Sequence, residues 1–309
     1  MKPVFQRTLK NRISCTGIGL HTGVAVSLTL HPAPVDSGIV FQRSDVPAGI
    51  SRIPARWDRV RASTLCTTIG NDFGTQVMTI EHLMAALAGC GIDNAVVEVN
   101  GPEVPVMDGS AAPFVLLLEC AGIATQDAPR RFLRVLKAVE VVDGDRSMRL
   151  SPSEEFRVDF EIDFASAAIA RQTRTFQGAE LSFKEEIARA RTFGFAEEVS
   201  MLRANGFARG GTLENAVVVD GDTVLNPGGL RFEDEFVRHK LLDVIGDLYL
   251  AGPALANVTC VRSGHTLSHR VLRALFADKS AWCMDSLEDE AEAVAAPRPR
   301  KAAAAAAAR

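Results

Sequence analysis

The sequence lacks an excess of either charge and any long apolar run. Its 34 Lys and Arg residues face 38 Asp and Glu residues, a net charge of −4 that argues against nucleic acid as the main partner. No apolar run approaches the roughly 20 residues of a membrane-spanning helix. The opening Met-Lys-Pro-Val-Phe-Gln-Arg-Thr lacks the apolar core of a signal peptide. We therefore expect a cytoplasmic globular protein with no transmembrane segment.

Three common chemical motifs are also missing. The six cysteines include no Cys-x-x-Cys pair, so we expect reduced thiols rather than a disulfide framework. No His-Glu-x-x-His is present, which excludes the common metalloprotease helix. The glycines of residues 17–23 do not match the Gly-x-Gly-x-x-Gly spacing, and no long helix follows them. They predict a turn rather than a dinucleotide-binding loop.

The 309 residues, 47% of them hydrophobic, can supply about two domains. Strand-like segments open each half and helices close it, which predicts an α+β fold with two similar halves. The predicted helices are residues 80–88, 113–121, 184–204, 232–251 and 267–277. We place an N-terminal β/α domain at residues 1–124, a linker at 125–131 and a C-terminal β/α domain at 132–284. The acidic and alanine-rich residues 285–309 are expected to be disordered.

Three polar residues interrupt the apolar helix predicted near residue 240. His239, Asp243 and Asp247 are spaced by four, so they lie along one side of that helix. Buried carboxylates need a cation, a metal ion or a dense hydrogen-bond network. Alternatively, Asp243 and Asp247 pair with Lys240 or an arginine.

A second histidine can complete a metal site. Thr79 is the expected N-cap of the helix at residues 80–88, which places Glu81 and His82 in its first turn, where the helix dipole favours an ionised carboxylate and a neutral imidazole. His82, His239 and Asp243 would give three ligands and an open position, as in catalytic zinc sites. The same set suits Fe²⁺. Alternatively, Glu81 only complements the helix dipole and His82 packs.

A third histidine, His265, lies in Ser-Gly-His-Thr between a strand-like run and a helix. If it pairs with Asp247, it keeps its proton at neutral pH and can act as an acid or as a positive charge facing an oxyanion. An ordinary turn histidine is the alternative. His21 is expected to be structural, and no role is predicted for His31 or His269.

Taken together, the motifs from about Thr8 to Trp282 resemble the UDP-3-O-acyl-N-acetylglucosamine deacetylase family, zinc amidases of lipid A synthesis in Gram-negative bacteria. The resemblance rests on Gly17-Ile-Gly-Leu-His-Thr-Gly23, Thr79-Ile-Glu-His-Leu-Met-Ala-Ala-Leu-Ala88, Met107-Asp-Gly-Ser-Ala-Ala-Pro-Phe114, Ala190-Arg-Thr-Phe-Gly-Phe195, Leu230-Arg-Phe-Glu-Asp-Glu-Phe-Val-Arg-His-Lys240 and Ser263-Gly-His265. It implies two β/α domains of similar topology, with their helices sandwiched between the sheets and the active site at the domain interface.

The resemblance also implies a reaction and the residues that perform it. The reaction is hydrolysis of the acetamide of UDP-3-O-(3-hydroxyacyl)-N-acetylglucosamine to the free amine and acetate. The implied zinc ligands are His82, His239 and Asp243; the general base is Glu81; Thr192 donates to the oxyanion; and His265, oriented by Asp247, is the protonated partner. Whether Glu81 or His265 protonates the leaving amine stays open.

Substrate contacts follow from the same resemblance. The acyl passage is implied at Val199, Phe207, Gly210, Gly211 and Leu213, the diphosphate at Lys240 and Arg262, the uridine at Phe164 and Phe195, and further substrate contacts at Phe193, Leu65 and Cys66. A Cys66 thiolate could capture a second, inhibitory ion. For the apolar positions, ordinary core packing is the alternative.

Two other functions remain open from the sequence. One is a non-haem metal enzyme of different chemistry, and the other is a non-catalytic acyl- or nucleotide-binding module. A base, three metal ligands and a charged partner together argue against the binding module. We expect a monomer.

Overall fold

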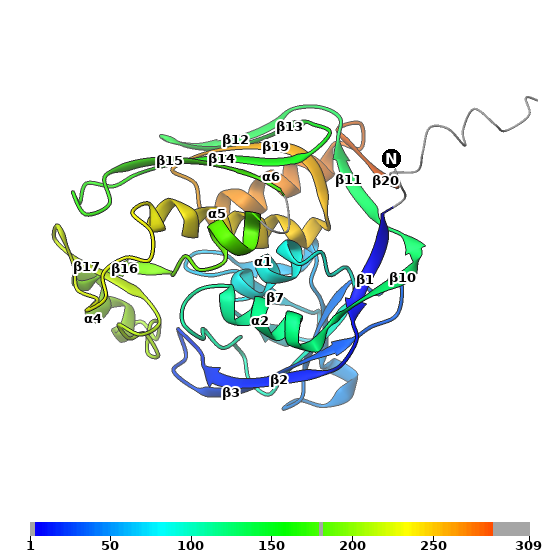
Figure 1. Cartoon of the computed structure of the whole chain (residues 1–309), viewed down its shortest axis with the longest axis horizontal. Coiled ribbons are helices and arrows are strands. Elements are labelled where there is room, and N and C mark those ends of the chain that lie inside the picture. Colours follow the sequence, from blue (N-terminus) through cyan, green and yellow to red (C-terminus); the bar gives the residue numbers. More distant parts are fainter. Residues whose placement is uncertain (1–3, 179–181, 287–309) are drawn as a thin grey trace, which may run out of the picture.

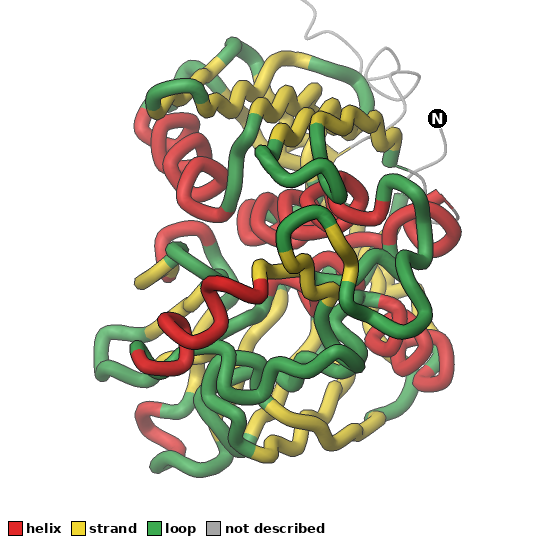
Figure 2. Tube along the Cα trace, turned by 90° about the vertical axis from the view of Figure 1, so that its left-hand side faces the viewer, coloured by secondary structure: helices red, strands yellow, loops and turns green. Residues whose placement is uncertain are grey.

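Two sheets enclose a layer of helices in the computed structural model, which describes residues 4–178 and 182–286. In Figure 1 one sheet lies above the helices and another below them. Figure 2, from the side, shows the same order of strands, helices and strands. The predicted α+β fold and the helices sandwiched between sheets are therefore confirmed.

The upper sheet has seven strands, all from the C-terminal half. They are β11 (Arg131–Val135), β12 (Val139–Asp143), β13 (Arg146–Pro152), β14 (Phe156–Asp163), β15 (Arg171–Gln177), β19 (Ala254–Val261) and β20 (Trp282–Ser286). Apolar and polar residues alternate along β14, so Val158, Phe160 and Ile162 are buried on one face. That face is the one that can cover the helices.

The lower sheet has five strands, all from the N-terminal half. They are β2 (Ile13–Ile18), β3 (Ala25–Pro32), β4 (Ile39–Arg43), β5 (Arg52–Pro54) and β9 (Ala95–Val99). Three smaller sheets complete the described chain. They comprise β1 (Phe5–Leu9) with β10 (Ile123–Pro129); β6 (Val60–Ala62), β7 (Thr68–Gly70) and β8 (Gln76–Val77); and β16 (Phe193–Phe195), β17 (Val217–Asp220) and β18 (Thr223–Val224).

The helices between the sheets position the site. They are α1 (Glu81–Gly89), α2 (Ala112–Ala121), α5 (Glu235–Leu248) and α6 (His265–Ala277). Every residue of α5 except Arg238 and Lys240 is buried. A Cβ at Gly246 of α5 would lie 2.1 Å from the Glu81 carbonyl oxygen of α1. Glycine at this position therefore allows the two helices to approach closely, which brings their polar residues together.

The single helix predicted over residues 184–204 is wrong. The structure has a π-helical turn at Phe183–Ile187, then strand β16, then α4 (Ala196–Ala204). β16 pairs with β17 in parallel, and Phe193 packs edge-to-face on Phe236 with ring centroids 5.0 Å apart. Tertiary pairing of this kind overrides local helical preference.

Two further local predictions also differ from the structure. Ile80, not Thr79, is the N-cap of α1; Thr79 has φ +55° and its hydroxyl donates to Glu103. Most of the predicted linker is strand β10, which pairs with β1. The domain boundary stays a prediction. Residues 285 and 286 of the predicted disordered tail belong to β20, and the rest of that tail lies outside the described residues.

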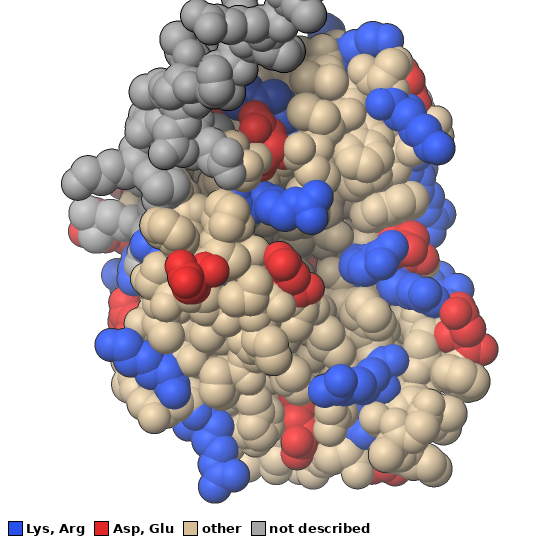
Figure 3. Space-filling model, turned by 90° about the vertical axis from the view of Figure 1, so that its right-hand side faces the viewer, with Lys and Arg blue, Asp and Glu red and all other residues tan. Residues whose placement is uncertain are grey.

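All six cysteines are free thiols. Within residues 4–178 and 182–286, none of the helices combines the length and apolar character needed to cross a membrane. On the face shown in Figure 3, basic and acidic side chains are interspersed on a largely uncharged surface.

Candidate active site

Two helices bring His82, His239 and Asp243 to one point. His82 lies in the first turn of α1, and the other two are one turn apart on α5. Asp243 Oδ1 is 3.4 Å from His239 Nε2 and 3.7 Å from His82 Nε2. All three residues are buried, and one ligand atom from each lies within 4.8 Å of the others. The spacing is that of a site able to hold one metal ion.

The protonation of these residues suits a cation. The His239 Nδ1–H donates to the Ala190 carbonyl at 3.1 Å, so Nε2 keeps its lone pair toward Asp243. Burial and the neighbouring His239 lower the pKa of His82 to about 3. Burial opposes ionisation of Asp243, but His239 and Lys240 hold its pKa well below the ordinary range.

One buried atom of this group has no hydrogen-bond partner. That atom is Asp243 Oδ1, the oxygen that both imidazoles face. An unpaired buried carboxylate oxygen is costly unless a cation completes it. Two neutral imidazoles and one carboxylate therefore fit a divalent ion such as Zn²⁺ or Fe²⁺.

Glu81 directly precedes His82 on α1. Its Oε2 accepts the Thr67 backbone N–H at 3.0 Å, and its Oε1 is 3.8 Å from His265 Nε2. Burial raises the pKa of Glu81 to about 8, although His265 acts in the opposite direction. In the protein alone, burial therefore favours the protonated form of Glu81, opposite to the effect expected from the helix terminus. A pKa near neutrality suits a group that takes and returns a proton.

His265 begins α6 and pairs with Asp247 of α5. Its Nδ1 is 2.8 Å from Asp247 Oδ2. Burial alone would lower the pKa of His265, but Asp247 first and Asp243 second raise it to about 9. The imidazole is thus charged at neutral pH, and Nε2–H is the proton it can offer.

Two residues behind this pair were missed by the sequence reasoning. The Thr67 hydroxyl donates to Asp247 Oδ1 at 2.6 Å and lies 2.9 Å from His269 Nε2. A signal did exist for His269, because it follows His265 by four residues, and in α6, which begins at His265, this spacing puts both histidines on one face. No local pattern marks Thr67.

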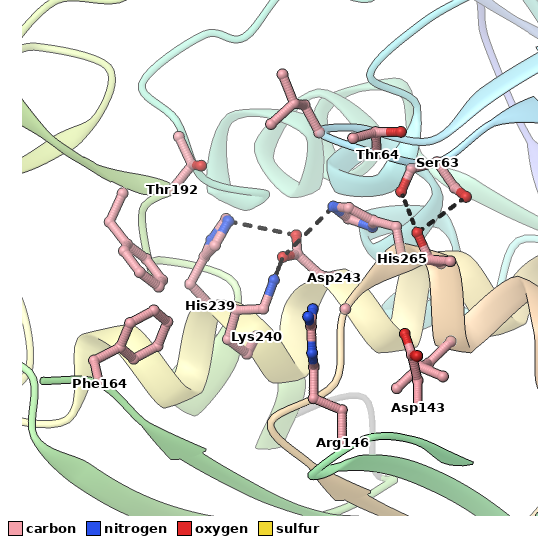
Figure 4. Close-up of a pocket in the computed structure, with 15 residues that line it drawn as sticks. Ser63, Thr64, Asp143, Arg146, Phe164, Thr192, His239, Lys240, Asp243 and His265 are labelled. Atoms are coloured by element: carbon pink, nitrogen blue, oxygen red, sulfur yellow. Dashed lines mark hydrogen bonds and ion pairs between the residues drawn. The ribbon is translucent and has the colours of Figure 1, made fainter. Parts of the chain in front are cut away.

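His239, Asp243 and His265 line a cavity of about 300 Å³. Figure 4 shows Thr192, His239, Lys240, Asp243 and His265 around it, with Arg146 of β13 extending toward them from the upper sheet. Thr192 lines the cavity, and its backbone N–H donates to the Gly109 carbonyl oxygen at 2.8 Å; its role as an oxyanion donor stays a prediction. Arg146 was not predicted, and it is the arginine that lines this cavity.

A second, mostly apolar cavity of about 350 Å³ adjoins the first. Leu65, Thr192 and Phe193 line both. Of the residues implied for the acyl passage, Val199, Gly211 and Leu213 line this second cavity. Phe207 and Gly210 do not line it: Phe207 contacts His21, which lines the cavity, with ring centroids 5.4 Å apart, and Gly210 lies close to the Gly19 carbonyl.

The remaining substrate positions differ in their surroundings. Phe164 lines the first cavity and Phe195 the second, with ring centroids 5.9 Å apart. Arg262 is engaged by Asp145 at 2.5 Å and by Asp163, and it does not line the first cavity. Burial raises the pKa of Cys66 to about 12. Burial thus disfavours the thiolate in the protein alone, and capture of a second ion by Cys66 stays a prediction.

Lys240 is held close to the metal-site residues. Its Nζ donates to Asp243 Oδ2 at 2.8 Å, and Asp243 raises the pKa of this ammonium despite its burial. The ion pair anticipated from the sequence as an alternative to metal binding thus exists, but it engages only Oδ2. Oδ1 remains directed to the imidazoles.

Paired helices that present three buried ligands, a carboxylate and a charged imidazole define a metal-dependent hydrolase. The family model for LpxC, UDP-3-O-acyl N-acetylglycosamine deacetylase, matches residues 6–277. The chain therefore belongs to this deacetylase family, whose members are metalloenzymes.

Curated relatives agree with the family match. UDP-3-O-acyl-N-acetylglucosamine deacetylases of Shewanella oneidensis and Shewanella violacea are each 51% identical to this chain over 293 residues, covering 94% of the chain and 95% of the relative. The protein of the same name from Shewanella baltica strain OS155 is 51% identical over 292 residues, with the same coverage.

Proposed function

We propose that the protein hydrolyses the acetamide of UDP-3-O-(3-hydroxyacyl)-N-acetylglucosamine, releasing acetate and UDP-3-O-(3-hydroxyacyl)-glucosamine for lipid A biosynthesis. The observation that supports this most is the placement of Glu81 and His265, 3.8 Å apart, beside the buried trio His82, His239 and Asp243. The name shared by its relatives specifies the substrate. The cytoplasmic location and the monomeric state stay predictions.

The trio would hold a divalent ion, Zn²⁺ in the first instance and Fe²⁺ as the alternative. When bound, such an ion supplies Lewis-acid activation of water and of the acetamide carbonyl. The His239 tautomer fixed by Ala190 and the ionised Asp243 are the forms that can coordinate it.

Glu81 is proposed as the general base. Its Oε2 is engaged by the Thr67 N–H, which leaves Oε1 to accept the proton of the attacking water. A divalent ion at the adjacent trio adds positive charge and so favours the ionised carboxylate, against the effect of burial.

His265 is proposed to protonate the leaving amine. Asp247 occupies Nδ1, so the proton available for transfer is the one on Nε2, the atom that faces Glu81. With a pKa of about 9, the imidazole holds this proton before the reaction begins. Thr192 lines the same cavity and is proposed to donate to the developing oxyanion, a contribution of roughly 3 kcal/mol for a well-placed donor.

The two adjoining cavities suit the two ends of the substrate. The apolar cavity with Val199, Gly211 and Leu213 would accept the acyl chain. Lys240, which lines the polar cavity, and Arg262 are proposed to contact the diphosphate, and Arg146, which lines the same cavity, is a further candidate. Phe164 lines that polar cavity and is proposed as a contact of the uridine.

The test is release of acetate from UDP-3-O-acyl-N-acetylglucosamine by zinc-loaded and iron-loaded protein. N-acetylglucosamine without the acyl chain and the nucleotide is the control substrate. We expect turnover of the first and none of the second. Protein that keeps its metal and yet releases no acetate from the acylated substrate would refute the proposal.

A further inference from the structure

Thr67 contacts two of the carboxylates that the proposed reaction uses, Glu81 and Asp247. It is completely buried and directly precedes β7. Its backbone N–H donates to Glu81 Oε2 at 3.0 Å, and its hydroxyl donates to Asp247 Oδ1 at 2.6 Å. Thr67 does not line either cavity beside the metal trio. Its contacts therefore concern the catalytic side chains and not the substrate.

The Thr67 hydroxyl lies between Asp247 and His269, and together these two residues fix the direction of its hydrogen bonds. An ionised Asp247 can only accept hydrogen bonds, so the single Thr67 hydroxyl proton is directed to it. The oxygen then accepts a bond from His269 Nε2, which lies 2.9 Å away and must hold the hydrogen. Burial lowers the pKa of His269, which keeps this imidazole neutral.

These bonds join parts of the chain that are distant in sequence. Thr67 belongs to the N-terminal half, whereas Asp247 on α5 and His269 on α6 belong to the C-terminal half. The Thr67 carbonyl also accepts the Ile80 N–H at 3.3 Å, one residue before Glu81. The peptide at Thr67 is thus attached to the start of α1 by its N–H and its carbonyl, and its hydroxyl is attached to the opposite half.

We propose that Thr67 is a positioning residue that sets the placement of Glu81 relative to the Asp247–His265 pair, with His269 orienting its hydroxyl. This rests on the proposed function. Glu81 Oε1 and His265 Nε2 are 3.8 Å apart because each is held from behind, Glu81 by the Thr67 N–H and His265 by Asp247. Without the hydroxyl, Asp247 would lose one of its hydrogen bonds, and the two halves would lose a connection directly behind the reacting groups.

Three substitutions test the proposal in the zinc-loaded protein. Thr67→Val removes the hydroxyl but keeps the shape and the N–H, and Thr67→Ser keeps both donors. Thr68→Val is the matched control, because this neighbouring buried threonine has its hydroxyl 3.8 Å from Cys66 Sγ and contacts neither carboxylate. We expect Thr67→Val to lower kcat about 10- to 100-fold, as for a buried acceptor left unsatisfied. KM and zinc content should remain close to those of the parent, and kcat in the other two variants should stay within about threefold.

A double-mutant cycle separates positioning from general destabilisation. If Thr67 acts through Asp247, adding Thr67→Val to Asp247→Asn should lower kcat by much less than it does in the parent protein. Losses of kcat that multiply across the two substitutions would overturn the proposal.

Should Thr67→Val fail to fold, His269→Leu and His269→Gln replace it. Leucine should lower kcat several-fold and glutamine, which retains a donor, should restore it; equal kcat in both would count against the proposal.

A second readout does not depend on turnover. In protein labelled with ¹⁵N-histidine, the His265 Nδ1–H resonance reports its bond to Asp247. It should shift in Thr67→Val but not in Thr67→Ser or Thr68→Val. An unshifted resonance in folded Thr67→Val would overturn the proposal. Absence of acetate release by the parent protein would instead refute the proposed function, and the resonance would still decide the role of Thr67.

Discussion

Replacing Asp247 by asparagine should convert His265 from a charged into a largely neutral imidazole at neutral pH. Asp247 is completely buried, and its Oδ2 is 2.8 Å from His265 Nδ1. Although burial lowers it, the pKa of His265 rises from 6.5 to about 9 because of Asp247 and Asp243. That rise corresponds to about 3 kcal/mol in favour of the charged form, at ~1.4 kcal/mol for each tenfold change.

Asparagine keeps the shape of Asp247 but removes its charge. Since Asp243 and Glu81 still favour the imidazolium, we expect the pKa of His265 to fall by about two pH units rather than to drop far below the ordinary value. An acid must be protonated to act, so activity declines above its pKa. The basic limb of the kcat/KM profile should therefore move about two pH units lower, with a loss near pH 8 much larger than the loss near pH 6.

Unfolding should show the same linkage with a defined sign. A histidine whose pKa is raised by folding stabilises the native state fully below about pH 6.5, and this stabilisation disappears as the pH rises toward 9. The difference in unfolding free energy between the parent and Asp247→Asn should therefore be larger at pH 6 than at pH 9. Denaturant titrations at the two pH values measure it.

Asp93→Asn is the matched control. Asp93 is part of a partly buried ion pair, with Arg130 Nε at 2.7 Å, but it follows the opposite end of α1 from Glu81. This variant should lose stability without moving the basic limb. The pH profile of acetate release, together with an NMR titration of His265, decides the matter. A basic limb in Asp247→Asn that coincides with that of the parent would refute the assignment of His265 as the acid.

Three further predictions concern the metal, the helix contact and the acyl cavity. Glu81→Ala should keep bound zinc and lose most turnover, whereas His239→Ala should lose the metal. Metal analysis and acetate release measure these effects, and turnover retained in both variants would contradict the mechanism. Gly246→Ala should lower stability by roughly 1–3 kcal/mol because its Cβ would lie 2.1 Å from the Glu81 carbonyl, while Gly228→Ala, with nothing within 4 Å, should melt like the parent. Val199→Trp should lower kcat/KM about tenfold for long acyl chains and leave zinc content unchanged, and an equal loss with a short acyl chain would argue against the apolar cavity as the acyl site.

The sequence was informative wherever a property depends on neighbours within one or two helical turns. The spacing of His239, Asp243 and Asp247 placed three polar groups on one side of a buried helix, and α5 has them there. The alternation along residues 156–164 predicted a strand with one buried face, which is β14. Helical and strand periodicities are local, so a single segment is enough to reveal them.

The tertiary structure alone decided how these groups are paired and ionised. Spacing left Asp247 free to bind a metal, an arginine or His265, and the packing of α6 beside α5 paired it with His265. Burial gave Glu81 a pKa of about 8 where the helix terminus predicted an ionised carboxylate. Strand pairing likewise divided the helix predicted over residues 184–204. Thr67 was invisible in the sequence, because hydrogen-bond partners and desolvation depend on segments about 180 residues apart being packed together.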